Sequence, residues 1–312
     1  MLAGHFRASH KNYVVIGVAF IWLASLAFIK QYETQIQRIN PRRSWGTDVC
    51  GFPLPMNYSE PHGCLLQSPV GPGLQAEGVK GPYNECNYFT ENFVRAYCGV
   101  ETSTHEVVRK LVTPSDVVLE VGARYGTTSC ELAAAMNNTG ALISVEPDHV
   151  VWAAMEFNKM SHRCRGYSVL GVLGDEDVWM AGYKDEEEMG MGENKGEDKG
   201  YNKRSKKEDT GEMVRIRHFT WDYVEEQTRL RVNTVILDCE GCWVEFIDKH
   251  EDRFRNQIEK IVLENDYPIE YHDYETVTRM GIEKLKSWGF REDKKVSPGD
   301  VKWLGSILVF TK

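Results

Sequence analysis

The stretch that decides the fold runs from residue 117 to residue 146 and reads VVLEVGARYGTTSCELAAAMNNTGALISVE. It opens with a short apolar run, Val117–Val121, which is typical of a buried parallel strand. A turn with two glycines follows, and Thr127–Asn137 then has the composition of a helix. The next apolar run, Ala141–Val145, is a second strand candidate. This order predicts a unit of two parallel strands joined by a helix.

The same alternation continues toward the C-terminus. Two further helices are expected at His149–Ser161 and Glu275–Ser287, and Gly289 suits the position just after the second one. Further strand candidates are Tyr167–Leu170, Thr234–Asp238, Lys260–Glu264 and Ser306–Thr311. We therefore predict the α/β fold class, with a Rossmann-like, doubly wound and mostly parallel sheet that helices cover on both faces.

Glu120, Gly122 and Gly126 mark the turn between the first strand and its helix. The chain must turn sharply there while its backbone stays close to a ligand, and glycine allows both because it has no Cβ atom. The spacing differs from the GxGxxG fingerprint of dinucleotide-binding proteins, whose helix points at a pyrophosphate. S-adenosylmethionine has no phosphate, and a carboxylate beside the loop suits its charged amino group. We predict that these residues bind that cofactor; a purely structural glycine turn is the alternative.

Glu146 ends the second predicted strand, about two dozen residues after the glycine loop. A carboxylate at this point can accept hydrogen bonds from both ribose hydroxyls of a nucleoside. The alternative is a solvated glutamate at a strand end. After the third strand, the segment from Gly171 to Asp175 can line the adenine side, although a plain turn explains it equally well.

Three carboxylates follow the later strands. Asp238 and Glu240 come at the end of one apolar run, and Glu264 comes at the end of the next. Ligands in open α/β sheets bind at the carboxyl ends of the strands, and residues two apart on a strand share a face. These acids can therefore hold an acceptor hydroxyl, remove its proton or bind a divalent cation. The alternative is that they cap a helix or form ion pairs.

The chain has an even number of cysteines. They are Cys50, Cys64, Cys86, Cys98, Cys130, Cys164, Cys239 and Cys242. Four of them precede residue 100 in a loop-rich stretch, where disulfides would stabilise a segment that lacks its own core. Free thiols in a cytosolic protein are the alternative. The CxxC pair at 239 and 242 also suggests a redox or zinc site, but a disulfide or simple packing is favoured because there is no second CxxC. We predict no metal site from the histidines, which form no cluster with ligand spacing.

The order of LEVGARYGTTS, ISVEP, VLGVLGDED, HFTWDYVEE, VILDCEGCW and IVLEND resembles the FkbM-type methyltransferases. The resemblance covers residues 100 to 312, and its most distinctive part is the D-x-E-G element that begins at Asp238. It implies a class I fold that uses S-adenosylmethionine, with Glu120, Gly122 and Glu146 at the cofactor. It also implies that Asp238 and Glu240 lie at the methyl end. The chain departs from the family pattern at Arg124–Tyr125 and Cys242–Trp243.

The N-terminal part divides into segments of different composition. After a tail at residues 1–12, residues 13–29 read YVVIGVAFIWLASLAFI without a charge and would span about 25 Å as a helix. We predict a transmembrane anchor there; a cleaved signal peptide and a buried helix are the alternatives. Residues 30–87 form an expected irregular stem rich in Pro and Gly, and residues 88–112 look helical. The methyltransferase domain spans residues 88–312, with a charged, disordered insert expected at residues 184–212.

The compartment limits the choice of substrate. Glycosylation sequons at Asn57 and Asn137, together with the cysteines, favour a lumenal C-terminal domain in the endoplasmic reticulum or Golgi. The net charge of -9 argues against a nucleic-acid partner. We therefore expect an O-methyltransferase that acts on a hydroxyl of a glycan or small molecule. The rivals are a catalytically inert binding or scaffold domain and a nicotinamide-dependent enzyme on a similar sheet.

Overall fold

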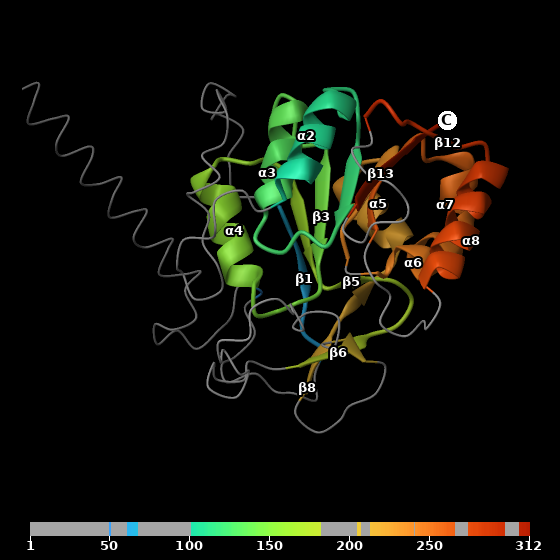
Figure 1. The fold of residues 1–312 in the computed structure, drawn as a ribbon. Helices are drawn as coiled ribbons and strands as arrows, with labels where there is room; N and C mark the ends of the chain where they lie inside the picture. The colour runs from blue at the N-terminus through green and yellow to red at the C-terminus, as the bar shows by residue number, and fades with distance from the viewer. Residues whose placement is uncertain are drawn as a thin grey trace, which may run out of the picture.

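An eight-stranded sheet forms the centre of the molecule (Figure 1). We describe it from a computed structural model, which covers residues 50, 61–67, 101–181, 205–206, 213–239, 241–265, 274–296 and 306–312. In spatial order the strands are β1 (Cys64–Gln67), β4 (Tyr167–Leu170), β3 (Leu142–Glu146), β2 (Val118–Val121), β10 (Thr234–Leu237), β11 (Lys260–Asn265), β13 (Ser306–Thr311) and β12 (Arg291–Glu292).

The five central strands, from β4 to β11, run parallel to one another. The outer strands are antiparallel to their neighbours, β1 at one edge and β13 with β12 at the other. Along the chain, the strands first progress from β2 toward β4 and then continue on the other side of β2 with β10 and β11. This reversal is the topological switch of a doubly wound sheet, so the predicted fold class is confirmed.

Helices cover both faces of this sheet. They are α2 (Thr102–Leu111), α3 (Thr127–Ala135), α4 (Trp152–Ser161), α5 (Trp221–Thr228), α6 (Trp243–Lys249), α7 (Glu251–Asn256) and α8 (Tyr274–Ser287). Successive side chains of a strand point to opposite faces. In β2, Val118 accordingly packs with α2 and α3, whereas Leu119 and Val121 pack with α5, α6, α7 and α8.

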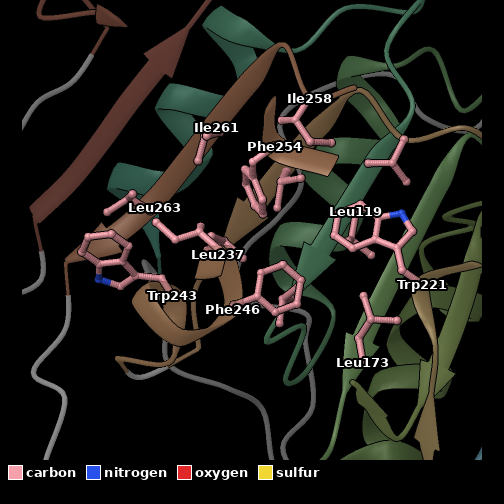
Figure 2. Close-up of a cluster of buried hydrophobic side chains, with 14 of the residues drawn as sticks. Leu119, Leu173, Trp221, Leu237, Trp243, Phe246, Phe254, Ile258, Ile261 and Leu263 are labelled. Carbon is pink, nitrogen blue, oxygen red and sulfur yellow. The ribbon is translucent and has the colours of Figure 1, made fainter. Parts of the chain in front are cut away.

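The core on the second face is rich in aromatic side chains (Figure 2). Trp221 and Phe246 lie with their ring centroids 5.9 Å apart, and Phe246 contacts Phe254 edge to face at 6.2 Å. Trp243, on the same helix as Phe246, is 1% exposed. Truncation of such a buried aromatic residue typically costs about 3–5 kcal/mol, so this cluster fixes α5, α6 and α7 on the sheet.

The stem differs from the expectation in one place. Cys64–Gln67, inside the predicted irregular segment, forms β1 and pairs with β4, and a disulfide joins Cys50 to Cys64. A run of four residues is too short to show a strand period in sequence, and it is ordered by the free edge of β4. The stem apart from residues 50 and 61–67 lies outside the described residues, and so do Cys86, Cys98, Asn57 and the predicted anchor at residues 13–29. Among the helices that are described, none is long and apolar enough to cross a membrane.

The insert is partly ordered. A three-stranded antiparallel sheet pairs β6 (Val178–Ala181) with β8 (Met213–Ile216) on one edge and with β7 (Ser205–Lys206) on the other. Because β7 falls within residues 184–212, the prediction of disorder across that whole range is wrong at these two residues. Backbone pairing with β6 orders them even though their composition is polar. The remainder of the range lies outside the described residues. A separate two-stranded sheet pairs β5 (Val172–Leu173) with β9 (His218–Phe219) in parallel.

Candidate active site at the switch point of the sheet

The glycine loop and the loop after β10 meet at the switch point. The register pairs Val121 with Leu237, so Gly122 and Asp238 come next to each other. Gly122 has a φ of +92°, and a Cβ atom placed on it would lie 1.6 Å from the carbonyl oxygen of Asp238. The predicted glycine turn is therefore confirmed, but the backbone that Gly122 approaches is the neighbouring loop of the protein.

Three contacts hold the rest of the glycine loop in place. Gly126, with a φ of +74°, precedes the first turn of α3, and its N–H donates to the carbonyl of Ala123 at 2.7 Å. Asn158 on α4 donates its side-chain N–H to the carbonyl of Tyr125 at 2.9 Å. Arg124 has a left-handed backbone, with a φ of 43°, and its N–H donates to the Glu146 carboxylate at 2.6 Å. The loop thus has a defined backbone conformation that α4 and β3 both support.

Glu146 connects two loops at the end of β3. One carboxylate oxygen accepts the Arg124 N–H, and the other accepts the N–H of Asp148 at 2.7 Å. Burial and the nearby Asp148 carboxylate raise the pKa of Glu146 to about 8, while the two N–H donors act in the opposite direction. In the ionised form each oxygen keeps a second acceptor site, and in the protonated form the O–H can donate instead. Hydrogen bonds to a ribose therefore remain a prediction that the geometry allows.

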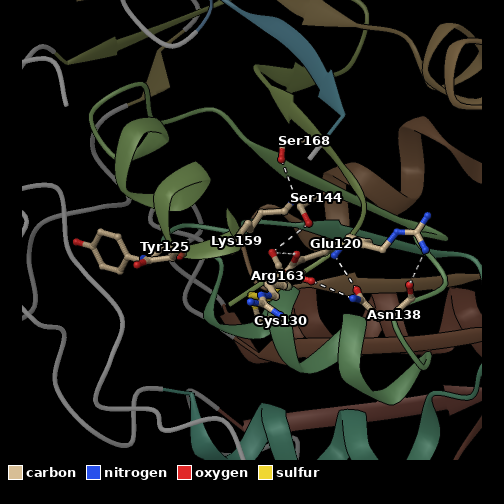
Figure 3. Close-up of a disulfide and its surroundings, with 12 residues drawn as sticks. Glu120, Tyr125, Cys130, Asn138, Ser144, Lys159, Arg163 and Ser168 are labelled. Carbon is tan, nitrogen blue, oxygen red and sulfur yellow. Dashed lines mark hydrogen bonds between the residues drawn. A yellow bond between two sulfur atoms is a disulfide. The ribbon is translucent and has the colours of Figure 1, made fainter. Parts of the chain in front are cut away.

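Glu120 is buried near Ser144 and the first turn of α3 (Figure 3). Its carboxylate accepts from the Ser129 hydroxyl on α3 at 2.5 Å, and the Ser144 hydroxyl donates to the Ser129 oxygen at 3.0 Å. Burial raises the pKa of Glu120 to about 6. Its atom Oε1 is buried and has no hydrogen-bond partner among the described residues. The carboxylate thus keeps a free acceptor under the first turn of the helix.

Asp238 and Glu264 come to the same edge of the sheet. β10 pairs with β11 in register up to Leu237 and Leu263, which places the two acids at one level, and both are half-buried. The strand ends at Leu237, so the alternation of a strand does not extend to Asp238 and Glu240. The expected shared face of these two acids has no support in the strand geometry, and Glu240 lies outside the described residues.

A disulfide closes the loop directly after Asp238. It joins Cys239 to Cys242 at a Cα–Cα distance of 5.4 Å, as the disulfide alternative proposed. Cys242 precedes α6, whose first residue, Trp243, packs against Gly281 of α8. The described residues contain no group of three or more side chains suited to hold a metal ion.

Asp175 is exposed after β5, on the side of β4 and β5. It borders a solvent-open hollow of about 560 Å³ that is also lined by the start of α5 and the junction of α6 and α7. His250, in this junction, has its pKa lowered to about 4 by burial, although Asp175 opposes the shift. His250 is therefore neutral at neutral pH. A contact between Asp175 and an adenine remains a prediction.

Sequence reasoning missed Glu101. Its backbone is left-handed, with a φ of 60°, and its carboxylate accepts from the hydroxyls of Thr127 and Thr128, each at 2.6 Å. It thus lies at the first turn of α3, directly after the glycine loop. The residue is 26 positions before Thr127 in the chain, and no periodicity connects them. The only signal was a pair of threonines where a helix begins.

No protein-family model matches the sequence, and a comparison with curated proteins finds no match. Among solved structures, precorrin-6y C5,15-methyltransferase from Geobacter metallireducens matches with a TM-score of 0.37 and 13% identity, over 75% of this chain and 99% of that one. An O-methyltransferase from Bacillus cereus, crystallised with SAH, matches with a TM-score of 0.33 and 9% identity, over 70% of this chain and 83% of that one. These scores are low, so the class of the fold rests on its strand order and register.

The contact between the two loops makes Gly122 irreplaceable. We expect Gly122→Ala to lower the free energy of unfolding by more than about 2 kcal/mol, because the added Cβ atom meets backbone and the positive φ strains an alanine. The matched control is Gly174→Ala, since a Cβ atom there has nothing within 4 Å. Urea denaturation measures both. Equal losses in the two variants would contradict the contact.

The raised pKa of Glu146 gives a pH dependence with a definite sign. The unfolded carboxyl ionises near its ordinary value of 4.5, whereas the folded one keeps its proton until about pH 8. The folded state therefore binds more protons between these values, and stability falls as the pH rises. Between about pH 5.5 and about pH 8.5, we expect the free energy of unfolding to decrease by at least about 1 kcal/mol less in Glu146→Gln than in wild type.

Urea denaturation at the two pH values checks this expectation. Glu226→Gln, which changes an exposed glutamate on α5, is the control and should keep the wild-type slope. Glu120 also makes stability fall as the pH rises, but at lower pH, and it is unchanged in both variants. A Glu146→Gln slope equal to the wild-type slope would show that Glu146 is ionised throughout.

Proposed function

We propose that this chain is an S-adenosylmethionine-dependent methyltransferase, and that it methylates a hydroxyl group of a glycan or small molecule. The single observation that supports this best is the contact of Gly122 with Asp238. It brings the loop expected to bind the cofactor against the loop that carries the candidate base. Group transfer needs these two parts side by side, because the reacting atoms must be held about 3 Å apart.

The residues of the site fit such a cofactor. Ionised Glu146 keeps acceptor sites for hydroxyl groups at the end of β3, and Glu120 has a buried oxygen that no described residue contacts by a hydrogen bond, near the first turn of α3. Both lie on strands next to the switch point, where ligands bind in open α/β sheets. When bound, S-adenosylmethionine supplies an electrophilic methyl group on a sulfonium ion. The protein has to position an acceptor and remove its proton.

Asp238 is our candidate for that base, with Glu264 beside it and Glu240 as the third acid of the sequence prediction. Asp238 is half-buried at the mouth of the switch point, and its N–H is tied to the carbonyl of Val121 at 3.0 Å. The disulfide that starts at Cys239 restricts the loop directly after it. A carboxylate on a restricted loop can accept a hydroxyl proton while the oxygen forms its bond to the methyl carbon.

Isothermal titration with S-adenosylhomocysteine and a nicotinamide dinucleotide tests the cofactor. We expect S-adenosylhomocysteine alone to bind. Binding of the dinucleotide alone would overturn the proposal in favour of a nicotinamide-dependent enzyme. Labelled methyl donor, offered with extracts of hydroxyl-bearing acceptors, then tests the reaction. We expect Asp238→Asn to keep cofactor affinity within about twofold and to lower turnover at least about a hundredfold. Cofactor binding without transfer to any acceptor would favour an inert scaffold.

We also propose a lumenal location, in the endoplasmic reticulum or Golgi, with residues 13–29 as the membrane anchor. Three disulfides support an oxidising compartment, namely Cys50–Cys64, Cys130–Cys164 and Cys239–Cys242. The sequon at Asn137 lies on an exposed turn after α3. This turn is at the end of the helix away from the glycine loop, so a glycan there would leave the candidate site open.

Expression in a eukaryotic cell tests the location. We expect the protein to lose mass on glycosidase treatment, and Asn137→Gln to remove part of that loss. The six cysteines in the three disulfides should resist alkylation in denaturant until a reductant is added. A protein without glycan whose thiols all react at once would place the domain in the cytosol. The glycan acceptor would then lose its support, whereas the cofactor proposal would stand.

A further inference from the structure

Two carboxylates converge on the first turn of α3. Glu101 approaches from the start of α2 and accepts hydrogen bonds from Thr127 and Thr128, the first two residues of the helix. Glu120 approaches from β2 and accepts from Ser129, the third residue. The side chain of Glu120 is about 1% exposed, and its Oε1 has no partner among the described residues. A buried acceptor without a donor indicates that the turn is built to receive one.

Glu101 is held rigidly in this position. α2 and α3 pack in parallel, and Arg109 on α2 donates two hydrogen bonds to the carboxylate of Glu131 on α3, at 3.0 and 2.6 Å. The His105 ring lies 3.8 Å from the Glu101 carboxylate. Although burial opposes ionisation, the hydrogen bonds from the two threonines and the nearby His105 ring hold the pKa of Glu101 below its usual value. A negative charge therefore stays at this turn.

The first turn of α3 carries negative charge, whereas the corresponding turn of a dinucleotide-binding site is positive. The N-terminus of a helix after a glycine loop attracts anions, and dinucleotide-binding proteins place the pyrophosphate of their cofactor there. In this chain, two carboxylates accept hydrogen bonds from the three side-chain hydroxyls of the first turn and bring negative charge to it. A pyrophosphate would meet like charge, whereas an ammonium group would meet a partly buried anion and a free acceptor.

We propose that Glu101 determines the specificity of the site, by binding the α-ammonium group of the methyl donor and by excluding cofactors that carry a pyrophosphate. The proposal rests on the proposed function, because it concerns the amino-acid part of S-adenosylmethionine. Glu120 supplies the second acceptor for the same ammonium group. The ribose and the adenine would then contact the ends of β3 and β5.

The test compares two ligands that differ in the group concerned. S-adenosylhomocysteine carries the α-ammonium group, and 5′-methylthioadenosine has a methyl group in place of the whole amino-acid part. The variant is Glu101→Gln, whose side-chain carbonyl still accepts from the threonine hydroxyls. The control is Glu106→Gln, which removes the same charge from an exposed position on the same helix. Isothermal titration gives the dissociation constants, and thermal unfolding reports the effect on stability.

We expect Glu101→Gln to bind S-adenosylhomocysteine at least about tenfold more weakly than wild type, and to bind 5′-methylthioadenosine within about twofold. Glu106→Gln should match wild type with both ligands. An equal loss for both ligands would show a structural role and overturn the proposal, and so would no loss for either. If the wild-type protein binds neither ligand, the proposed function itself fails.

A second measurement tests the proposal even if the Glu101→Gln variant does not fold. Wild-type protein is titrated with the analogue of S-adenosylhomocysteine in which hydrogen replaces the α-amino group. We expect this analogue to bind at least about tenfold more weakly than its parent. Equal affinity of the analogue and its parent would overturn the proposal without reference to any variant.

Discussion

The close approach of Gly122 to the backbone of Asp238 is the constraint on which the rest of the structure depends. Two parallel strands from distant parts of the chain end side by side there, and their loops leave no room for a Cβ atom between them. The glycine loop can turn toward α3 only because this contact fixes where β2 stops. The loop after β10 is fixed in the same way, and Cys239–Cys242 then closes it. Because Gly122 has no Cβ atom, its contact with Asp238 sets the positions of both halves of the candidate site.

Glu146 extends this arrangement to the next strand. Its carboxylate joins the glycine loop to the loop after β3 through two backbone N–H groups. Most of the free energy that holds the site comes from the cores on the two faces of the sheet, where apolar side chains of alternating strand positions are buried. The polar contacts at the edge select one arrangement of the loops. The site is therefore shaped by a few buried acids on a scaffold that apolar packing stabilises.

The parts that follow from local patterns were predictable from sequence. The bounds of Tyr167–Leu170 and Ser306–Thr311 were predicted correctly, because buried strands are short apolar runs between turns. Features that depend on distant partners were not. β1 is ordered by the edge of β4, β7 by β6, and Glu101 by threonines on another helix. Asp238 lies where it was expected relative to the sheet, but the end of β10 one residue earlier removed the strand argument for Glu240.

The disulfide between Cys130 and Cys164 has a consequence for biosynthesis. It ties α3 to the chain just before β4, and both cysteines are fully buried in the finished core. An oxidant can reach these sulfur atoms only while the helix and the strand are still apart. The bond must therefore form during assembly, in an incomplete domain whose apolar surfaces are exposed to other chains. Cells that make this protein in quantity would therefore need oxidising enzymes and chaperones to act on it while the domain is still incomplete.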